Sequence, residues 1–259
     1  MIDAVAIGEA LAAIGVRSGD SALVHSDAIV AAQLPPLPDA KRLDLLIDAL
    51  QASVGSEGTL VMPTFSYSFT KNETYDVLNT PSTVGMLTEH FRTQANVCRS
   101  ADPIFSLAAR GLRAKELCSA PVKECFGPHS VFAALHCMNA HIVCLGCTLT
   151  GGGTFVHYVE KSNGVDYRYD KVFQGTIIWP DRSSTEASVV YYVRNLERKS
   201  GADLRRLQRR LEANGQLKKA TLGRVRVLGV RAADIYETAS QMLREDPSSL
   251  IEEGASREA

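Results

Sequence analysis

Residues 141–161 read HIVCLGCTLTGGGTFVHYVEK, and this stretch decides the class of fold. It opens with a continuous apolar run over 141–146, which is typical of a strand buried in a sheet. The glycines at 151–153 bend the chain, and residues 155–161 then open a helix. A buried strand that passes through a glycine-rich bend into a helix is typical of an α/β protein.

The alternation of strands and helices continues on both sides of this stretch. We expect strands over 21–26, 59–64, 106–109, 176–179 and 222–230, and helices over 6–16, 43–50, 82–93, 131–138, 203–213 and 232–243. Thr80-Pro81 is expected to start the helix at 82, and Ser130 to cap the helix at 131. The pattern predicts one α/β domain over residues 1–251, with a central mixed sheet flanked by helices, and a frayed tail over 252–259.

The composition is that of an ordinary globular protein. Of the 259 residues, 45% are hydrophobic and 22% are charged, and 28 Lys and Arg residues balance 29 Asp and Glu residues. A net charge of -1 argues against nucleic acid or an anionic membrane as a partner. The first residues lack the basic and apolar regions of a secretory signal, so we expect a cytoplasmic protein whose six cysteines are reduced thiols.

The most suggestive pair of side chains is His157 and Glu160, which follow the triple glycine. Residues three apart lie on one face of a helix, so the carboxylate could orient the imidazole and fix its tautomer. Such a pair can act as a general base that removes a proton from an amine or a hydroxyl. The alternative is an incidental surface pair.

Polar residues also stand where two expected strands end. His25 and Ser26 close the first strand, and Thr64 and Ser66 follow the second. Ligands of α/β sheets bind outside the carboxyl ends of strands, so these groups could hold phosphate or amide groups. They could equally satisfy their own turns. Nucleotide-binding glycine motifs and the Gly-x-Ser-x-Gly elbow of serine hydrolases are absent from the sequence.

Three thiols and an imidazole lie within 11 residues, at Cys137, His141, Cys144 and Cys147. They resemble a zinc ligand set. However, Cys144 lies inside the apolar run, and no second pair of ligands follows. We therefore expect no metal, with a zinc-stabilised interaction module as an alternative.

The segment 194–231 is basic, with 12 Lys or Arg residues against 3 acidic residues. Its helix carries an apolar stripe of Leu204, Leu207 and Leu211, so a solvated basic face is the expected reading. The alternative is a local attraction for a phosphorylated ligand.

Several segments in one order resemble the aminoglycoside 3-N-acetyltransferase family, also called the antibiotic N-acetyltransferase family. They are GVRSGD at 15–20, VHS at 24–26, GSEGTLVMPTFS at 55–66, RS at 99–100, SLAARG at 106–111, FGPHS at 126–130, LG at 145–146 and TFVHYVE at 154–160. The resemblance runs from about residue 8 to about residue 170. The blocks at 58–66 and 154–160 are its most specific parts.

The resemblance implies an antibiotic N-acetyltransferase-like α/β fold and an N-acyltransferase that uses acetyl-CoA or another short acyl-CoA. It implies His157 as the general base and Glu160 as its orienting partner. By the same likeness, acyl-CoA lies along His25, Ser26, Thr64, Phe65, Arg99, Ser100, Ser106, Leu107, Gly127 and Ser130. The acceptor is expected to contact Asp27, Tyr67, Tyr167 and Arg168.

One departure bears on the acceptor. The family commonly has two histidines where this chain has Asp102 and Phe105. An enzyme for polycationic antibiotics is expected to present an acidic site, whereas the second half of this chain is basic. We therefore expect an amino sugar that is nucleotide-linked, with aminoglycoside 3-N-acetylation as the alternative and a non-catalytic acyl-CoA-binding relative as a further one. A homodimer is possible.

Overall fold

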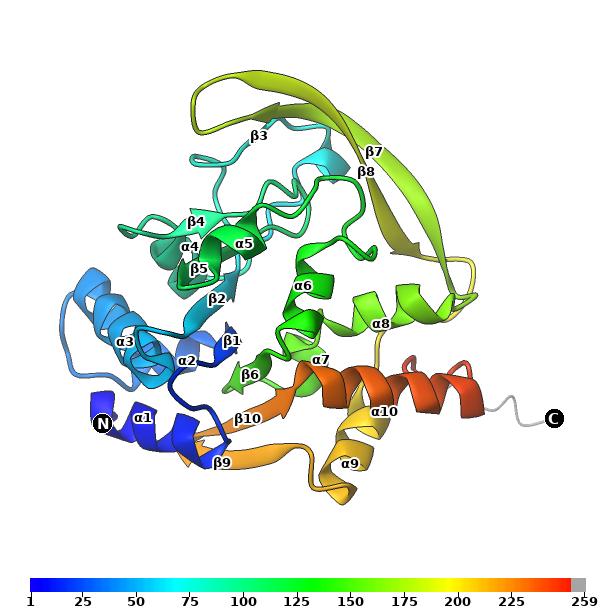
Figure 1. Cartoon of the computed structure of the whole chain (residues 1–259). Helices are drawn as coiled ribbons and strands as arrows, with labels where there is room; N and C mark the ends of the chain where they lie inside the picture. The colour runs from blue at the N-terminus through cyan, green and yellow to red at the C-terminus, as the bar shows by residue number, and fades with distance from the viewer. Residues whose placement is uncertain (253–259) are drawn as a thin grey trace.

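A seven-stranded sheet forms the centre of the molecule in a computed structural model that describes residues 1–252 (Figure 1). Its strands are β1 (Ser21–Ser26), β2 (Thr59–Pro63), β4 (Cys98–Arg99), β5 (Leu107–Gly111), β6 (His141–Leu145), β9 (Lys218–Leu222) and β10 (Val225–Arg231), in the order β4-β5-β2-β1-β6-β10-β9. The central strands β2, β1 and β6 are parallel, and their outer neighbours are antiparallel. The predicted mixed sheet is confirmed.

Helices cover both faces of this sheet. They are α1 (Ala4–Ala13), α2 (Ala28–Ala32), α3 (Asp39–Val54), α4 (Met86–Arg92), α5 (Ala114–Cys118), α6 (Val131–Cys137), α7 (Leu149–Gly152), α8 (Val156–Asn163), α9 (Arg205–Ala213) and α10 (Ala232–Glu245), with a 3₁₀ turn η1 (Phe69–Lys71). Alternate residues of a strand face opposite sides of a sheet. Accordingly, Val24 of β1 packs with α1, α3 and α4, while Leu23 packs with α6, α8 and α10.

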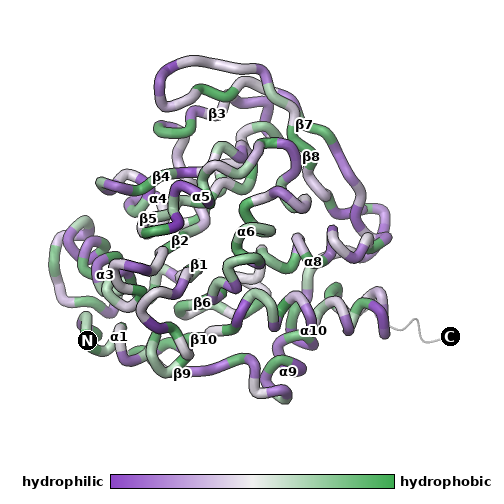
Figure 2. Tube along the Cα trace, viewed as in Figure 1, coloured by the Kyte–Doolittle hydropathy of each residue, from purple (hydrophilic) through white to green (hydrophobic). Residues whose placement is uncertain are grey.

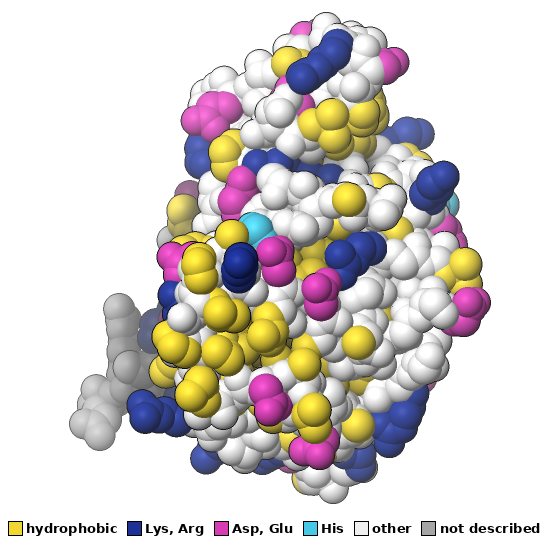
Figure 3. Space-filling model, turned by 90° about the vertical axis from the view of Figure 1, so that its left-hand side faces the viewer, with side chains coloured by type: hydrophobic (Ala, Val, Ile, Leu, Met, Phe, Trp, Pro, Cys, Tyr) yellow, Lys and Arg dark blue, Asp and Glu magenta, His cyan; other side chains and the backbone are white. Residues whose placement is uncertain are grey.

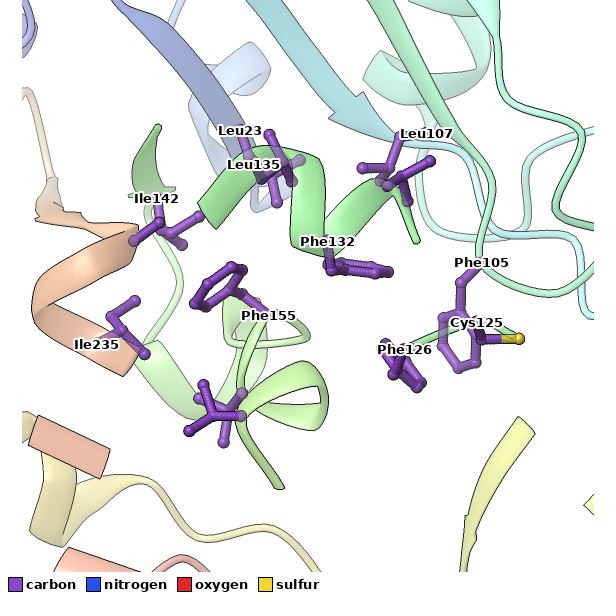
Figure 4. Packing of buried hydrophobic residues seen from close by; sticks show 14 of the residues in the cluster. Leu23, Phe105, Leu107, Cys125, Phe126, Phe132, Leu135, Ile142, Phe155 and Ile235 are labelled. Atoms are coloured by element: carbon purple, nitrogen blue, oxygen red, sulfur yellow. The ribbon is translucent and has the colours of Figure 1, made fainter. Parts of the chain in front are cut away.

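Two hydrophobic cores therefore share one sheet. Figure 4 shows part of the core on the α6 side, where Phe126, Phe132 and Phe155 are among the labelled buried side chains. This core holds the start of α8 in place. On the side of α1 and α3, charged side chains of both signs are scattered among hydrophobic ones (Figure 3).

A second, three-stranded sheet stands beside the first. It consists of β3 (Tyr75–Asp76), β7 (Arg168–Ile178) and β8 (Ser184–Arg194), and β7 and β8 form a long antiparallel hairpin with a hydrophilic tip (Figure 2). The sequence predicted only the apolar end of β7, at 176–179. Most residues of this hairpin are exposed or half-buried, so they lack the apolar run that marks a core strand.

Two predicted elements differ most from the structure. The helix expected at 82 begins at Met86 with Gly85 at its N-cap, because Thr80 instead closes a turn by accepting the N–H of Asp76. The single strand expected over 222–230 is a hairpin of β9 and β10, because Gly223 has a φ of +58° and turns the chain.

The chain end is partly described. Glu252 belongs to the fold, because its N–H donates to the carbonyl oxygen of Gly201 at 3.0 Å, and the rest of the expected tail, 253–259, lies outside the described residues. None of the helices within residues 1–252 is long and apolar enough to cross a membrane.

Candidate active site

The first turn of α8 carries the pair that the sequence singled out. His157 Nδ1 lies 2.7 Å from Glu160 Oε2, and the two residues share a face of the helix. The carboxylate is fully buried, whereas 20% of the His157 side chain is exposed. Because Nδ1 is occupied by the carboxylate, Nε2 is the nitrogen that His157 has available for a ligand.

Two further side chains hold the same carboxylate. Tyr167 donates its hydroxyl to Glu160 Oε1 at 3.0 Å, and Arg168 Nε lies 2.7 Å from Oε2. The Nε–H of Arg168 is not aimed at that oxygen, so this contact is an ion pair and not a hydrogen bond. Burial would raise the pKa of Glu160, but His157, Arg168 and Tyr167 together lower it, so the carboxylate stays charged.

Tyr167 and Arg168 therefore occupy other positions than the sequence reasoning expected. Both side chains are buried behind Glu160, and neither faces a surface open to an acceptor. Burial and the neighbouring carboxylate raise the pKa of Tyr167, which keeps its phenol protonated as a donor. Tyr167 and Arg168 therefore act on the site through Glu160, whose carboxylate they contact.

An aromatic wall begins at His157. The ring of Phe126 meets the imidazole edge to face with centroids 5.4 Å apart, and Phe105 packs on Phe126 at 4.8 Å. Tyr191 and Tyr67 continue the wall, at 4.9 and 5.4 Å from Phe105, and both are half-buried. Tyr67 is held at a φ of 57°, a conformation that costs a non-glycine residue energy and that clusters at functional sites. The resemblance implied Tyr67 as an acceptor contact, whereas Phe105, Phe126 and Tyr191 were not among the expected site residues.

The carboxyl end of β1 brings three predicted residues together. His25 is buried, its Nε2 has no hydrogen-bond partner among the described residues, and burial lowers its pKa to about 4. Ser26 is half-buried, and Asp27 is an exposed N-cap that accepts the N–H of Ile29 at 2.9 Å. His25 is therefore a neutral imidazole with an unused polar atom.

A cavity of about 470 Å³ opens beside this strand end. Asp27 and Thr148 line it after β1 and β6, and Lys219, Arg224 and Arg226 line it from the β9–β10 hairpin. Lys219 is paired with Glu212 at 2.7 Å, so Arg224 and Arg226 are the cations that outweigh Asp27 in this cavity, which suits an anion.

Other predicted ligand contacts form a buried internal network. Arg99 donates through Nε to the hydroxyls of Thr64 at 3.2 Å and Ser106 at 3.1 Å, and Ser106 donates to the Thr64 carbonyl oxygen at 2.7 Å. Ser100 accepts the N–H of Leu107 at 2.9 Å. These contacts tie β2, β4 and β5 together.

The remaining predicted contacts with acyl-CoA lie near this network or before α6. Phe65 is buried at the end of β2, at the far end of the aromatic wall. Gly127 is buried, and a Cβ there would come within 2.5 Å of a Glu124 carboxylate oxygen. Ser130 caps α6 by accepting the N–H of Ala133 at 3.2 Å, as predicted.

The cysteine and histidine side chains do not converge on one point, although Cys144 and Cys147 contact each other. Cys137 is exposed, Cys144 is buried in β6, and His141 lies 3.1 Å from a carboxylate oxygen of Asp20. Within residues 1–252, no group of three or more His, Cys, Asp or Glu side chains is placed to hold a metal ion.

Ion pairs neutralise part of the basic segment. Arg206 pairs with Asp246 at 2.8 Å, Arg210 with Glu245 at 2.6 Å and Lys219 with Glu212 at 2.7 Å. Its helix α9 buries Leu207 and Leu211 and turns its arginines outward. The expected solvated face is what the structure shows for α9.

Comparison with known proteins completes this description. The family model described as aminoglycoside 3-N-acetyltransferase matches residues 23–244. The chain is 32% identical over 244 residues to aminoglycoside N(3)-acetyltransferase IV of Salmonella sp, and the match covers 90% of this chain and 84% of that protein.

Solved structures share the fold. A histidine-to-alanine mutant of AAC(3)-IVa in complex with apramycin is 28% identical, with a TM-score of 0.76 over 96% of this chain and 94% of that one. AAC-IIIb in a binary complex with CoASH is 21% identical, with a TM-score of 0.79 over 94% and 96% of the two chains, and this likeness shows the fold alone.

Proposed function

Because the chain belongs to the aminoglycoside 3-N-acetyltransferase family and is an acetyl-CoA-dependent N-acetyltransferase, we propose that its acceptor is a primary amine of an aminoglycoside. The observation that supports a catalytic role for this chain is the 2.7 Å contact between His157 Nδ1 and Glu160. It directs Nε2 of a partly exposed imidazole outward as a base.

In the proposed reaction, His157 Nε2 takes a proton from the acceptor ammonium. The neutral amine then attacks the carbonyl carbon of the thioester and the carbon–sulfur bond breaks. The CoA thiolate takes up the second proton, which the nitrogen loses as it becomes an amide. The buried carboxylate of Glu160 stabilises the imidazolium that forms. Tyr167 and Arg168 are positioning residues, since they hold Glu160 charged and in place.

We place the phosphate groups of acetyl-CoA in the cavity beside Asp27. Arg224 and Arg226 in its wall complement the phosphates. The unpartnered Nε2 of His25, at the end of the neighbouring strand, offers a polar contact for the pantetheine arm.

The comparisons favour an aminoglycoside over the nucleotide-linked amino sugar that charge had suggested. That argument relied on the basic segment, yet Arg206 and Arg210 of α9 are paired with Asp246 and Glu245. Net charge thus says little about the acceptor site. Half-buried Tyr67 and Tyr191, on the aromatic wall that begins at His157, provide flat surfaces with hydroxyl groups, which suit a sugar ring.

The test is a thiol-release assay in which acetyl-CoA is offered with apramycin, with gentamicin and with a nucleotide-linked amino sugar. We expect turnover with an aminoglycoside and mass addition of one acetyl group to it. Turnover with the nucleotide sugar alone would overturn the proposed acceptor, and CoA binding without turnover would favour a non-catalytic relative.

A cytoplasmic location is part of the proposal. All six cysteines are free, which is typical of a reducing compartment.

A further inference from the structure

Cys98 and Cys118 bring their sulfurs to 2.7 Å from each other, although both are free thiols. Cys98 lies in the edge strand β4, and Cys118 is the last residue of α5. A disulfide has a sulfur–sulfur distance of about 2.05 Å, so the two sulfurs would need to close by about 0.7 Å. We propose that this pair is an oxidation site that forms an intramolecular disulfide.

The surroundings of the pair suit this reaction. Both thiols are half-buried, so a small oxidant can reach them while the fold keeps them together. The Cys98 sulfur also lies 3.2 Å from the carbonyl oxygen of Ala114, which anchors it to the start of α5. The contact with Cys118 lowers the pKa of Cys98, and the charge of Lys115 adds to this, which favours the thiolate of Cys98.

The step balances with hydrogen peroxide as the oxidant. The Cys98 thiolate attacks one peroxide oxygen and gives a sulfenic acid and hydroxide, which takes up the proton that the thiol lost. The Cys118 thiol then attacks the Cys98 sulfur, the sulfur–oxygen bond breaks, and water leaves. Two thiols are oxidised by two electrons, and one peroxide is reduced to two waters.

The bond would close a loop that contributes to the site. The segment between the two cysteines carries Arg99 and Phe105, and the Phe105 ring packs on Phe126 beside His157. The disulfide would tie β4 to α5 and so restrain both ends of this segment. The inference does not depend on which acceptor the enzyme uses.

Tryptic peptides make the test direct, because Cys98 and Cys118 fall in separate peptides, 93–99 and 116–123, with one cysteine each. The full chain is treated with hydrogen peroxide, the remaining thiols are alkylated, and the digest is analysed by mass spectrometry without reductant. We expect the two peptides to be linked in the wild type and in Cys144→Ser, and to be unlinked in Cys98→Ser.

Thermal unfolding gives a second readout. Closing a loop of about 20 residues is expected to raise Tm by about 5 °C, reversibly with dithiothreitol and only when Cys98 is present. Recovery of Cys98 and Cys118 as alkylated thiols after peroxide treatment, or a bond from either one to another cysteine, would overturn the proposal.

Discussion

The charge balance of the site depends on the buried carboxylate of Glu160. It faces His157, Tyr167 and Arg168, and the side chain of Arg168 is itself only 1% exposed. Glu160→Gln would leave a buried cation unpaired and remove the charge that stabilises an imidazolium. We expect a loss of about 3 kcal/mol in the free energy of unfolding and at least about 100-fold in kcat, measured by urea unfolding and thiol release.

The neighbouring Lys161 supplies a matched control for this variant. It lies on the same helix but pairs with Asp170 outside the buried cluster, at 2.5 Å. Lys161→Gln is expected to change the free energy of unfolding by less than about 0.5 kcal/mol and to leave kcat within about twofold. A fully active Glu160→Gln enzyme would remove Glu160 from the mechanism.

His25 makes stability depend on pH. Burial lowers its pKa from 6.5 to about 4, so the unfolded chain binds more protons than the folded one between these values. The free energy of unfolding should therefore fall as the pH drops from 6.5 towards 4, and His25 should account for about 3 kcal/mol of that fall. Burial also lowers the pKa of His136 and His141. The contribution of His25 is therefore measured as the difference between the wild type and a His25 variant. Urea unfolding of the wild type and of His25→Gln is measured across this pH range. The free energy of unfolding should change less steeply with pH in the variant, and an equal pH dependence would contradict the lowered pKa of His25.

At the scale of elements, the short helix α7 packs its last residue, Gly152, closely against β1 and β6. A Cβ on Gly152 would lie 2.7 Å from Cys144 Sγ and 3.1 Å from His25 Cβ, whereas a Cβ on Gly151 would meet its nearest atom at 3.6 Å. We expect Gly152→Ala to cost about 1–3 kcal/mol in unfolding free energy, because strand atoms on both sides must move.

Gly151→Ala serves as the control on the same helix and is expected to be neutral or stabilising by up to about 1 kcal/mol. Urea unfolding of both variants distinguishes them. Equal stabilities would mean that α7 is loosely packed against the strands.

The sequence predicts these elements unevenly, for physical reasons. Strands β1, β2 and β6 lie between two cores, so their apolar runs mark them clearly. The β7–β8 hairpin has few buried side chains and is held by β3 and by backbone hydrogen bonds, such as that from Val190 to the carbonyl oxygen of Lys123 at 2.8 Å. Hydrogen bonds between backbones leave no pattern in side-chain type.

The residues of the site are also predicted unevenly from the sequence. His157 and Glu160 are three residues apart on one helix, so their contact can be predicted from spacing. Arg168 joins them only because Gly164 ends α8 in a left-handed conformation, with φ at 62°, and returns the chain as β7. Phe105 and Phe126 reach the site through tertiary packing, and no local signal identifies them.

For the whole molecule, the positions of the charged side chains say more about ligand binding than the net charge does. Arg206 and Arg210 of α9 are paired with acids, as is Lys219, while Arg224 and Arg226 line the cavity beside Asp27. If the phosphates of acetyl-CoA bind there, Arg224→Gln with Arg226→Gln should raise KM for acetyl-CoA about tenfold and leave KM for the acceptor unchanged. The KM of the wild type should also rise with ionic strength.

A surface cation elsewhere controls for net charge. Arg198 pairs with Asp166 at 3.0 Å. The Arg198→Gln variant should leave KM for acetyl-CoA and KM for the acceptor unchanged. A double variant with an unaltered KM for acetyl-CoA would place the phosphates outside this cavity.

The most direct measurement is single-turnover acetyl transfer by the wild type and by His157→Ala, with acetyl-CoA and an aminoglycoside both saturating. If His157 is the general base, the variant should bind both substrates and transfer the acetyl group at least about 100-fold more slowly, and its rate should rise with pH as the free amine becomes available in solution. An unchanged rate in a folded His157→Ala variant would contradict the account, because the pair of His157 and Glu160 would then have no part in the chemistry.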